Sequence, residues 1–170
     1  MRRSSPLPPR VLTATKSAPG VPLALSRIAR RRPRATRRLT SVHARVLHRS
    51  HGRVATRWFG ARVLVLETVG RASGMRRAAA LVYLPDGDDL VVVPANAGAA
   101  RPPAWWLNLR AAGEGIAHVG GERRPVRPLE ARGAERERLW RRFAAVTPVA
   151  HYERAAGREL PVVVLRRAFA

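Results

Sequence analysis

The 170-residue sequence contains no cysteine, which excludes a disulfide framework, a thiolate zinc site and a cysteine nucleophile. It also lacks any apolar run close to the ~20 residues that a membrane-spanning helix needs. Acidic residues are scarce, with 11 against 33 basic residues and a net charge of +22. The length is nevertheless sufficient for one domain with its own hydrophobic core.

Acidic residues are absent from the N-terminal third of the chain. The first acidic residue is Glu67, and residues 1–66 hold 16 basic residues. Lys16 is the only lysine, and this arginine preference, together with abundant alanine, is typical of GC-rich coding. The number of arginines is therefore weak evidence for an arginine-rich functional patch, and their positions matter more.

Residues 1–38 contain no acidic or aromatic residue and many prolines, serines and threonines. Such a segment buries too little apolar surface to offset its ordering entropy. We therefore predict a disordered basic N-terminal extension over 1–38 and a folded domain over 39–170. Three alternatives remain for the extension: peripheral association with an anionic membrane, the less favoured association with nucleic acid, or a start codon assigned too far upstream.

The folded part is predicted to begin with a helix at 39–52, where apolar residues share one stripe and Gly52 can end the helix. His43, His48 and His51 occur here, but no acidic residue is near enough to complete a metal site. We predict ordinary surface or core histidines and no bound metal.

From residue 62 the pattern becomes that of short strands. We expect two of them to flank Gly87 in a hairpin turn, and prolines in another, Pro125 and Pro128, to indicate an edge strand or a bulge. About six antiparallel strands with packed helices predict an α+β fold, a small barrel rather than a doubly wound parallel sheet. The expected strands are 62–69, 78–84, 90–95, two within 115–132, and 160–165; the expected helices are 102–112, 133–146 and 148–155.

The stretch "GRASGMRR" (70–77) stands between two of the expected strands. Its glycines let backbone N–H groups approach a ligand, and Arg71, Arg76 and Arg77 can bind phosphate or carboxylate. The alternative is an ordinary hairpin loop with solvated arginines. Because no Walker lysine and no GxGxxG pattern is present, a nucleotide-binding α/β motif is not supported.

The stretch "ANAGAARPPAWWLNLR" (95–110) combines small residues with a helix start. Small side chains leave space beside the backbone, and the first turn of the helix offers free N–H groups to an anion. Trp105 and Trp106 diverge by ~100° on a helix, so one can enter the core while the other faces a ligand groove. Asn108 lies on a face similar to that of Trp105.

Catalytic constellations are sparse. No Ser/His/Asp set is recognisable, and Asp86, Asp88 and Asp89 belong to a predicted turn. The chain is better equipped to hold a planar or anionic ligand than to supply a nucleophile, which favours chemistry carried by a cofactor.

Taken together, "ETVGRASGMRR" (67–77), "LVYLPDGDDLVVVPANAGAARPPAWWLNLRA" (81–111), "GAERERLW" (133–140) and "HYERAAGRELPVVVL" (151–165) resemble the deazaflavin-dependent nitroreductase family. These are coenzyme F420-dependent oxidoreductases of the split β-barrel fold. The resemblance implies a cytoplasmic enzyme that transfers a hydride from the reduced deazaflavin to an electron-poor small molecule such as a quinone, an enone or a nitroaromatic. A homodimer is a further expectation.

The resemblance also implies a groove for the cofactor, whose phosphate and acidic oligoglutamate tail meet the glycine–arginine loop. Tyr152 is expected at the substrate end, where its phenol can orient the substrate or donate a proton. The cofactor-binding residues implied in this way are Arg71, Ser73, Gly74, Arg77, Ala80, Ala95, Asn96, Gly98, Ala99, Pro103, Trp105 and Asn108.

Three positions depart from the family pattern: Ala72 replaces a basic residue, Ala80 a proline and Ala95 a serine. Arg76 and Arg101 are candidates to compensate for the lost contact at Ala72. The alternative hypotheses are a changed ligand, such as FMN or haem, and a non-enzymatic basic split-barrel binding protein.

Overall fold

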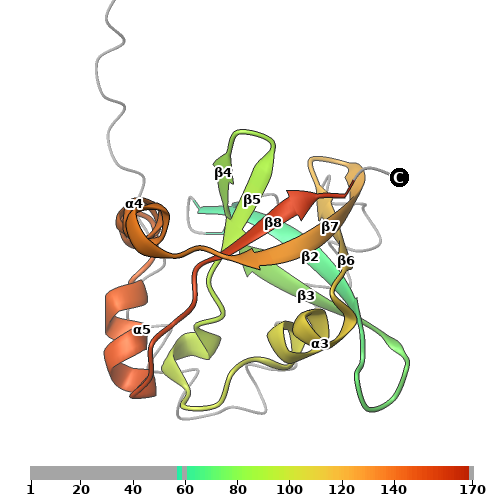
Figure 1. The fold of residues 1–170 in the computed structure, drawn as a ribbon, viewed down its shortest axis with the longest axis horizontal. Coiled ribbons are helices and arrows are strands. Elements are labelled where there is room, and N and C mark those ends of the chain that lie inside the picture. The colour runs from blue at the N-terminus through green and yellow to red at the C-terminus, as the bar shows by residue number, and fades with distance from the viewer. Residues whose placement is uncertain (1–56, 59–60, 169–170) are drawn as a thin grey trace, which may run out of the picture.

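The computed structural model describes residues 57–58 and 61–168. The predicted extension over 1–38 and the predicted helix over 39–52, with its three histidines, lie outside the described residues. Figure 1 shows a curled sheet with helices packed around it. The elements in chain order are β1 (Arg57–Trp58), β2 (Ala61–Val69), β3 (Arg76–Val82), β4 (Leu84–Asp86), β5 (Asp89–Val92), η1 (Asn96–Gly98), α3 (Ala104–Ala112), β6 (Gly115–Val119), β7 (Glu122–Glu130), α4 (Gly133–Ala144), α5 (Val149–Ala156) and β8 (Val163–Arg167).

The sheet follows the order β1-β2-β6-β7-β8-β5-β4, with β3 paired to β2. Every pairing is antiparallel, which confirms the predicted α+β split-barrel class. The described residues form eight strands rather than about six. One reason is that the expected strand 78–84 divides at Tyr83, whose N–H donates to the carbonyl of Arg62 at 3.0 Å.

The long strand β2 is buried on both faces, as its continuous apolar run predicts. Leu64 and Leu66 belong to a core that also contains Trp106 and Leu109 of α3. Val63 and Val65 point to the opposite face, where Ala80 and Val82 of β3 pack against them. α3 therefore covers only one of the two faces of β2.

The prediction that Pro125 and Pro128 indicate an edge strand or bulge is wrong. β7 lies between β6 and β8, and its ladders run without a bulge. The carbonyl of Pro125 accepts from the N–H of Ala168, one residue beyond β8. Backbone hydrogen-bonding groups point alternately to the two neighbouring strands, so those of Pro128 point toward β6. The pairing of β7 with β6 has already ended at Val126. Each missing proline N–H therefore falls where a ladder has ended.

Several predicted boundaries also shift. The strand expected at 90–95 ends at Val92, and the strand expected at 160–165 begins at Val163. Leu160 and Val162 are nevertheless buried, and the carbonyl of Val162 accepts from the N–H of Ala131. This hydrogen bond continues the β7–β8 register by one pair, whereas Leu160 is buried outside the paired residues, so the apolar pattern extends further than the strand.

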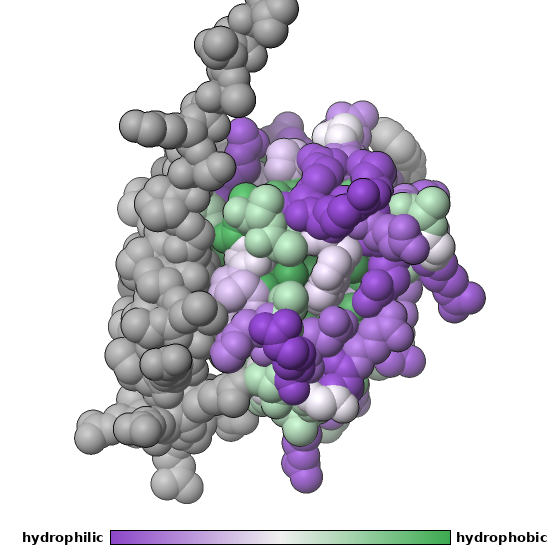
Figure 2. Space-filling model, turned by 90° about the vertical axis from the view of Figure 1, so that its left-hand side faces the viewer, coloured by the Kyte–Doolittle hydropathy of each residue, from purple (hydrophilic) through white to green (hydrophobic). Residues whose placement is uncertain are grey.

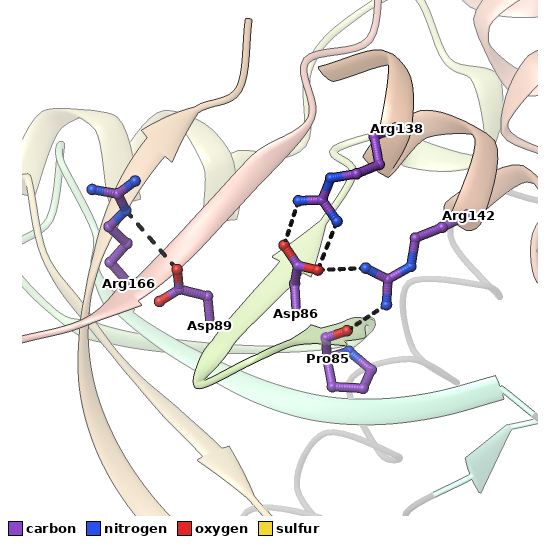
Figure 3. Close-up of polar contacts among 6 residues, drawn as sticks. All are labelled: Pro85, Asp86, Asp89, Arg138, Arg142 and Arg166. Carbon is purple, nitrogen blue, oxygen red and sulfur yellow. Dashed lines mark hydrogen bonds and ion pairs between the residues drawn. The ribbon is translucent and has the colours of Figure 1, made fainter. Parts of the chain in front are cut away.

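α4 is fastened to the tip of the β4–β5 hairpin by an ion-pair cluster (Figure 3). Arg138 donates through both terminal nitrogens to the carboxylate of Asp86, at 2.9 and 2.8 Å. Arg142 donates to the same carboxylate and to the carbonyl of Pro85. These contacts, first of all the hydrogen bond from Arg138, hold the pKa of Asp86 at about 2, below its ordinary 3.8.

We expect Asp86→Asn to lower the free energy of unfolding at neutral pH by about 1 kcal/mol, because both arginines are partly exposed and water weakens the pairs. Since the folded-state pKa is depressed, this contribution is present above about pH 4 and is lost as the pH falls toward 2. Urea unfolding should show the two proteins converging over that range. Asp88→Asn, in the exposed turn beside it, is the control and should match the wild type.

Candidate functional site

The two stretches singled out in the sequence meet at one side-chain contact. The backbone N–H and the Nη1 of Arg71 both donate to Oδ1 of Asn108, at 3.3 and 3.2 Å. Asn108 is buried on α3, whereas Arg71 lies in the exposed turn between β2 and β3. One guanidinium N–H of Arg71 is thereby bonded to Asn108, and the others remain as donors at the surface.

The turn that carries Arg71 is compact. The N–H of Gly70 donates to the carbonyl of Met75 at 2.8 Å, and the N–H of Gly74 donates to the carbonyl of Gly70 at 2.7 Å. Gly74 has a φ of 65°, and a Cβ added to Gly70 would lie 2.8 Å from Oγ of Ser73. The hydroxyl of Ser73 accepts from the N–H of Met75 at 3.4 Å. The glycines are thus needed for the turn itself, whatever it binds.

Arg76 and Arg77 leave β3 on opposite faces because successive strand residues alternate. Arg76 is largely exposed, with Nη1 3.8 Å from the carboxylate of Glu67. Arg77 pairs with Thr68 in the register, on the face that α3 covers. Arg77 therefore shares a face with the Arg71–Asn108 contact, and Arg76 does not.

Thr68 is a candidate residue that sequence reasoning missed. It is only 4% exposed, and its hydroxyl makes no hydrogen bond with any residue that the structure describes. A buried hydroxyl without a partner costs ~1–3 kcal/mol, and Thr68 stands opposite Arg77 in the register. The available signal was a hydroxyl at the next-to-last position of the run "VLVLETV", two residues before Gly70.

The small-residue stretch forms η1, the turn between β5 and α3 (Figure 1). Asn96 and Ala97 have φ values of 48° and 52°, which non-glycine residues seldom adopt. The side-chain amide of Asn96 donates to the carbonyl of Arg101 at 2.9 Å, closing the turn on itself.

Packing explains part of this run of small residues. Ala95 is buried in a cluster with Ala156 and Leu160, so α5 packs directly against the turn. A larger side chain at 95 would separate them. Ala99 and Ala100, in contrast, are exposed, and close packing does not account for their size.

The two tryptophans of α3 diverge as predicted. Trp106 is buried in the core, whereas Trp105 is only partly buried. Their ring centroids lie 6.1 Å apart in an edge-to-face arrangement. Pro103 precedes the helix in an extended conformation, and its carbonyl accepts from the N–H of Trp106 at 3.1 Å.

Tyr152 on α5 packs against the cluster that contains Ala95, and its ring lies edge-to-face with His151. Burial raises the pKa of the Tyr152 phenol above its ordinary 10.0. The phenol therefore stays protonated at neutral pH and can donate a hydrogen bond.

The expected site residues fall into three groups. Arg71, Arg77 and Asn108 lie on the α3 side of the β2–β3 hairpin, while Tyr152 packs against the cluster that contains Ala95. Ala80 stands apart, because it packs against Val63 and Val65 on the opposite face of β2. The hairpin, α3 and η1 lie along one edge of the molecule (Figure 1).

Three further observations concern the described residues. In the part of the chain that the structure describes, no three His, Asp or Glu side chains are grouped to hold a metal ion. The buried pair His118–Glu67, with Nε2 and Oε1 3.1 Å apart, ties β6 to β2 and was not foreseen from the sequence. None of the described helices is long and apolar enough to cross a bilayer.

A family model described as F420H(2)-dependent quinone reductase matches residues 39–167. Among curated proteins, an F420H(2)-dependent quinone reductase of Mycobacterium tuberculosis (strain ATCC 25618 / H37Rv) is 31% identical over 134 residues. That alignment covers 76% of this chain and 90% of the relative.

Two solved structures are also similar. One is described as an F420-H2 dependent reductase; it is 25% identical with a TM-score of 0.55, over 61% of this chain and 93% of that one. The other is described as a domain-swapped dimer; it is 23% identical with a TM-score of 0.58, over 78% of this chain and 99% of that one. The second likeness shows the fold alone.

Proposed function

Because the chain belongs to the F420H(2)-dependent quinone reductase family, we propose that the edge formed by the β2–β3 hairpin, α3 and η1 holds its coenzyme F420. The protein is an oxidoreductase, and coenzyme F420 is the cofactor of its family. The observation that carries the proposal is the contact of Arg71 with Asn108, which joins the two stretches that the sequence pattern singled out.

The hairpin is suited to the anionic part of the cofactor. Asn108 orients the guanidinium of Arg71, whose remaining N–H groups can pair with phosphate or carboxylate oxygens. Arg77 shares this face and makes no ion pair with any described residue. Ser73 and Gly74 complete the tip, and Thr68 offers a buried hydroxyl beneath it. Ala72 leaves the family's usual basic position empty, and exposed Arg76 lies on the other face.

The flat ring system of the cofactor requires a protein backbone that can come close to it and an apolar side-chain surface beside it. Gly98 and Ala99 present little side chain, and Ala95 and Asn96 precede them in the same turn. Partly buried Trp105 and Pro103 lie at the start of α3 as a wall. Ala80 packs on the opposite face of β2, so its proposed effect on the cofactor is indirect, through the position of β2 and β3.

When bound and reduced, coenzyme F420 supplies a hydride to an electron-poor substrate. The role of the protein is to bind the cofactor, to orient the substrate and to supply a proton. Tyr152 is the proposed donor, because its phenol remains protonated and its side chain packs against the cluster that contains Ala95. Quinones are the substrate class that the family supports; enones and nitroaromatics are extensions of the same proposal.

Fluorescence titration of the full chain with coenzyme F420 tests the proposal, followed by turnover of menadione with the reduced cofactor. We expect binding at micromolar cofactor and cofactor-dependent reduction. Absence of binding, or tighter binding of FMN or haem than of F420, would favour the alternative of a non-enzymatic carrier.

Location and assembly are also proposals. We infer a cytoplasmic protein from the family's use of F420H2, and a homodimer from the neighbour described as a domain-swapped dimer. Association of residues 1–38 with anionic membrane rests on their charge alone, and deletion of these residues should leave cofactor binding intact.

A further inference from the structure

Arg158 connects the end of α5 to the turn that contains η1. Its Nε donates to the carbonyl of Ala100 at 3.0 Å, and its Nη2 donates to the carbonyl of Pro94 at 3.1 Å. These two carbonyls bracket the turn, one before Ala95 and the other directly after Ala99. A single planar guanidinium therefore spans both ends of the segment.

The segment between these two carbonyls is strained. Asn96 and Ala97 have positive φ values, and Gly98 follows at 80°. Non-glycine residues keep such conformations only where the surroundings enforce them. The amide N–H of Gly98 donates to the carbonyl of Ala95, and that of Ala99 to the carbonyl of Asn96, so both amides report on whether the turn is formed.

Arg158 is itself held in place. α5 ends at Ala156, and Gly157 follows it with a φ of 63°. Two residues after Arg158, the fully buried Leu160 packs against Ala95. The N–H of Leu160 also donates to the carboxylate of Glu153 at 3.0 Å. Figure 2 views the α4 and α5 side, where hydrophilic side chains surround a band of apolar ones. Arg158 itself is partly buried.

We propose that Arg158 is a positioning residue for the cofactor: by clamping the carbonyls of Pro94 and Ala100, it fixes the backbone of residues 95–99 for close approach to coenzyme F420. This inference rests on the proposed function for that turn. Arg158 does not touch the cofactor, and it acts through the backbone that it holds.

The test compares Arg158→Ala and Arg158→Lys with Arg154→Ala, which removes the same charge from an exposed position on α5, the helix that ends two residues before Arg158. Arg158→Ala should raise the Kd for F420 about tenfold, the effect of losing charged hydrogen bonds. It should also accelerate hydrogen exchange at Gly98 and Ala99. The kcat for menadione at saturating cofactor should be unchanged. Arg158→Lys, which reaches one carbonyl but not both, should give an intermediate Kd, and Arg154→Ala should match the wild type.

Unchanged exchange at Gly98 and Ala99 together with an unchanged Kd would overturn the proposal. So would an equal loss of affinity in Arg154→Ala, because that result assigns the effect to net charge. If Arg158→Ala does not fold, Arg158→Lys carries the same comparison. If the wild type itself binds no F420, the proposed function fails, whereas exchange in the variants still decides whether Arg158 holds the turn.

Discussion

Replacement of Arg71 by alanine is expected to weaken F420 binding by about 10- to 100-fold while the fold is retained. The guanidinium lies at an exposed turn, so its removal leaves no cavity in the core. Charged hydrogen bonds to an anion contribute ~1.5–3 kcal/mol, which corresponds to this range of affinity. Fluorescence titration at fixed ionic strength measures the effect, and thermal unfolding checks the fold.

The matched control is Arg62→Ala, since Arg62 is also an exposed arginine of the same β2–β3 region but lies at the far end of β2. It removes the same charge and should change the affinity little. Equal losses in the two variants would mean that long-range attraction, and not a local contact, accounts for binding.

A double-mutant cycle with Asn108→Leu then separates orientation from charge. Asn108 is the acceptor that holds Arg71, so removal of either side chain should remove part of the same effect. The losses of binding free energy in the two single variants should therefore sum to more than the loss in the double variant. Strict additivity would show that the Arg71–Asn108 contact has no part in binding.

Leu109→Ala is expected to give the largest loss of stability, about 3 kcal/mol. Leu109 is fully buried where α3 packs on β2, and its Cδ1 lies 2.9 Å from where a Cβ of Gly115 would stand. Truncation leaves a cavity that β2 and β6, held in their ladders, cannot close. Denaturant unfolding measures the change.

Leu107→Ala, on the same helix but only partly buried, provides the control. It removes the same atoms and should cost clearly less, because part of the site is already open to water. Comparable losses would show that the effect comes from helix propensity or from the unfolded chain rather than from the core.

Much of the secondary structure followed from local pattern. The turn at Gly87, with a φ of 61°, and the apolar run of β2 were predictable. Both depend on residues that are adjacent in the sequence: the turn on a glycine, and the buried strand on a continuous run of apolar side chains. Boundaries were less predictable: Leu160 and Val162 are buried without belonging to β8. A pattern of burial does not reveal where a ladder begins.

The candidate site was predictable in parts but not as an arrangement. The glycine–arginine turn and the small-residue turn were both apparent, as was the divergence of Trp105 and Trp106. Thr68 and Arg158 were missed, since a lone threonine or arginine has no distinctive local pattern. Only its surroundings show that the Thr68 hydroxyl is buried and that Arg158 spans two carbonyls.

The sequence by itself determined most of the elements, the charge at the β2–β3 turn and the family resemblance. Tertiary structure alone decided that Arg71 meets Asn108, 37 positions away, and that Arg158 reaches carbonyls 58 and 64 positions away. It also decided that prolines can stand in a central strand, because two ladders end beside them. The physical reason is that such contacts depend on sheet register and helix packing, which arise from the whole chain at once.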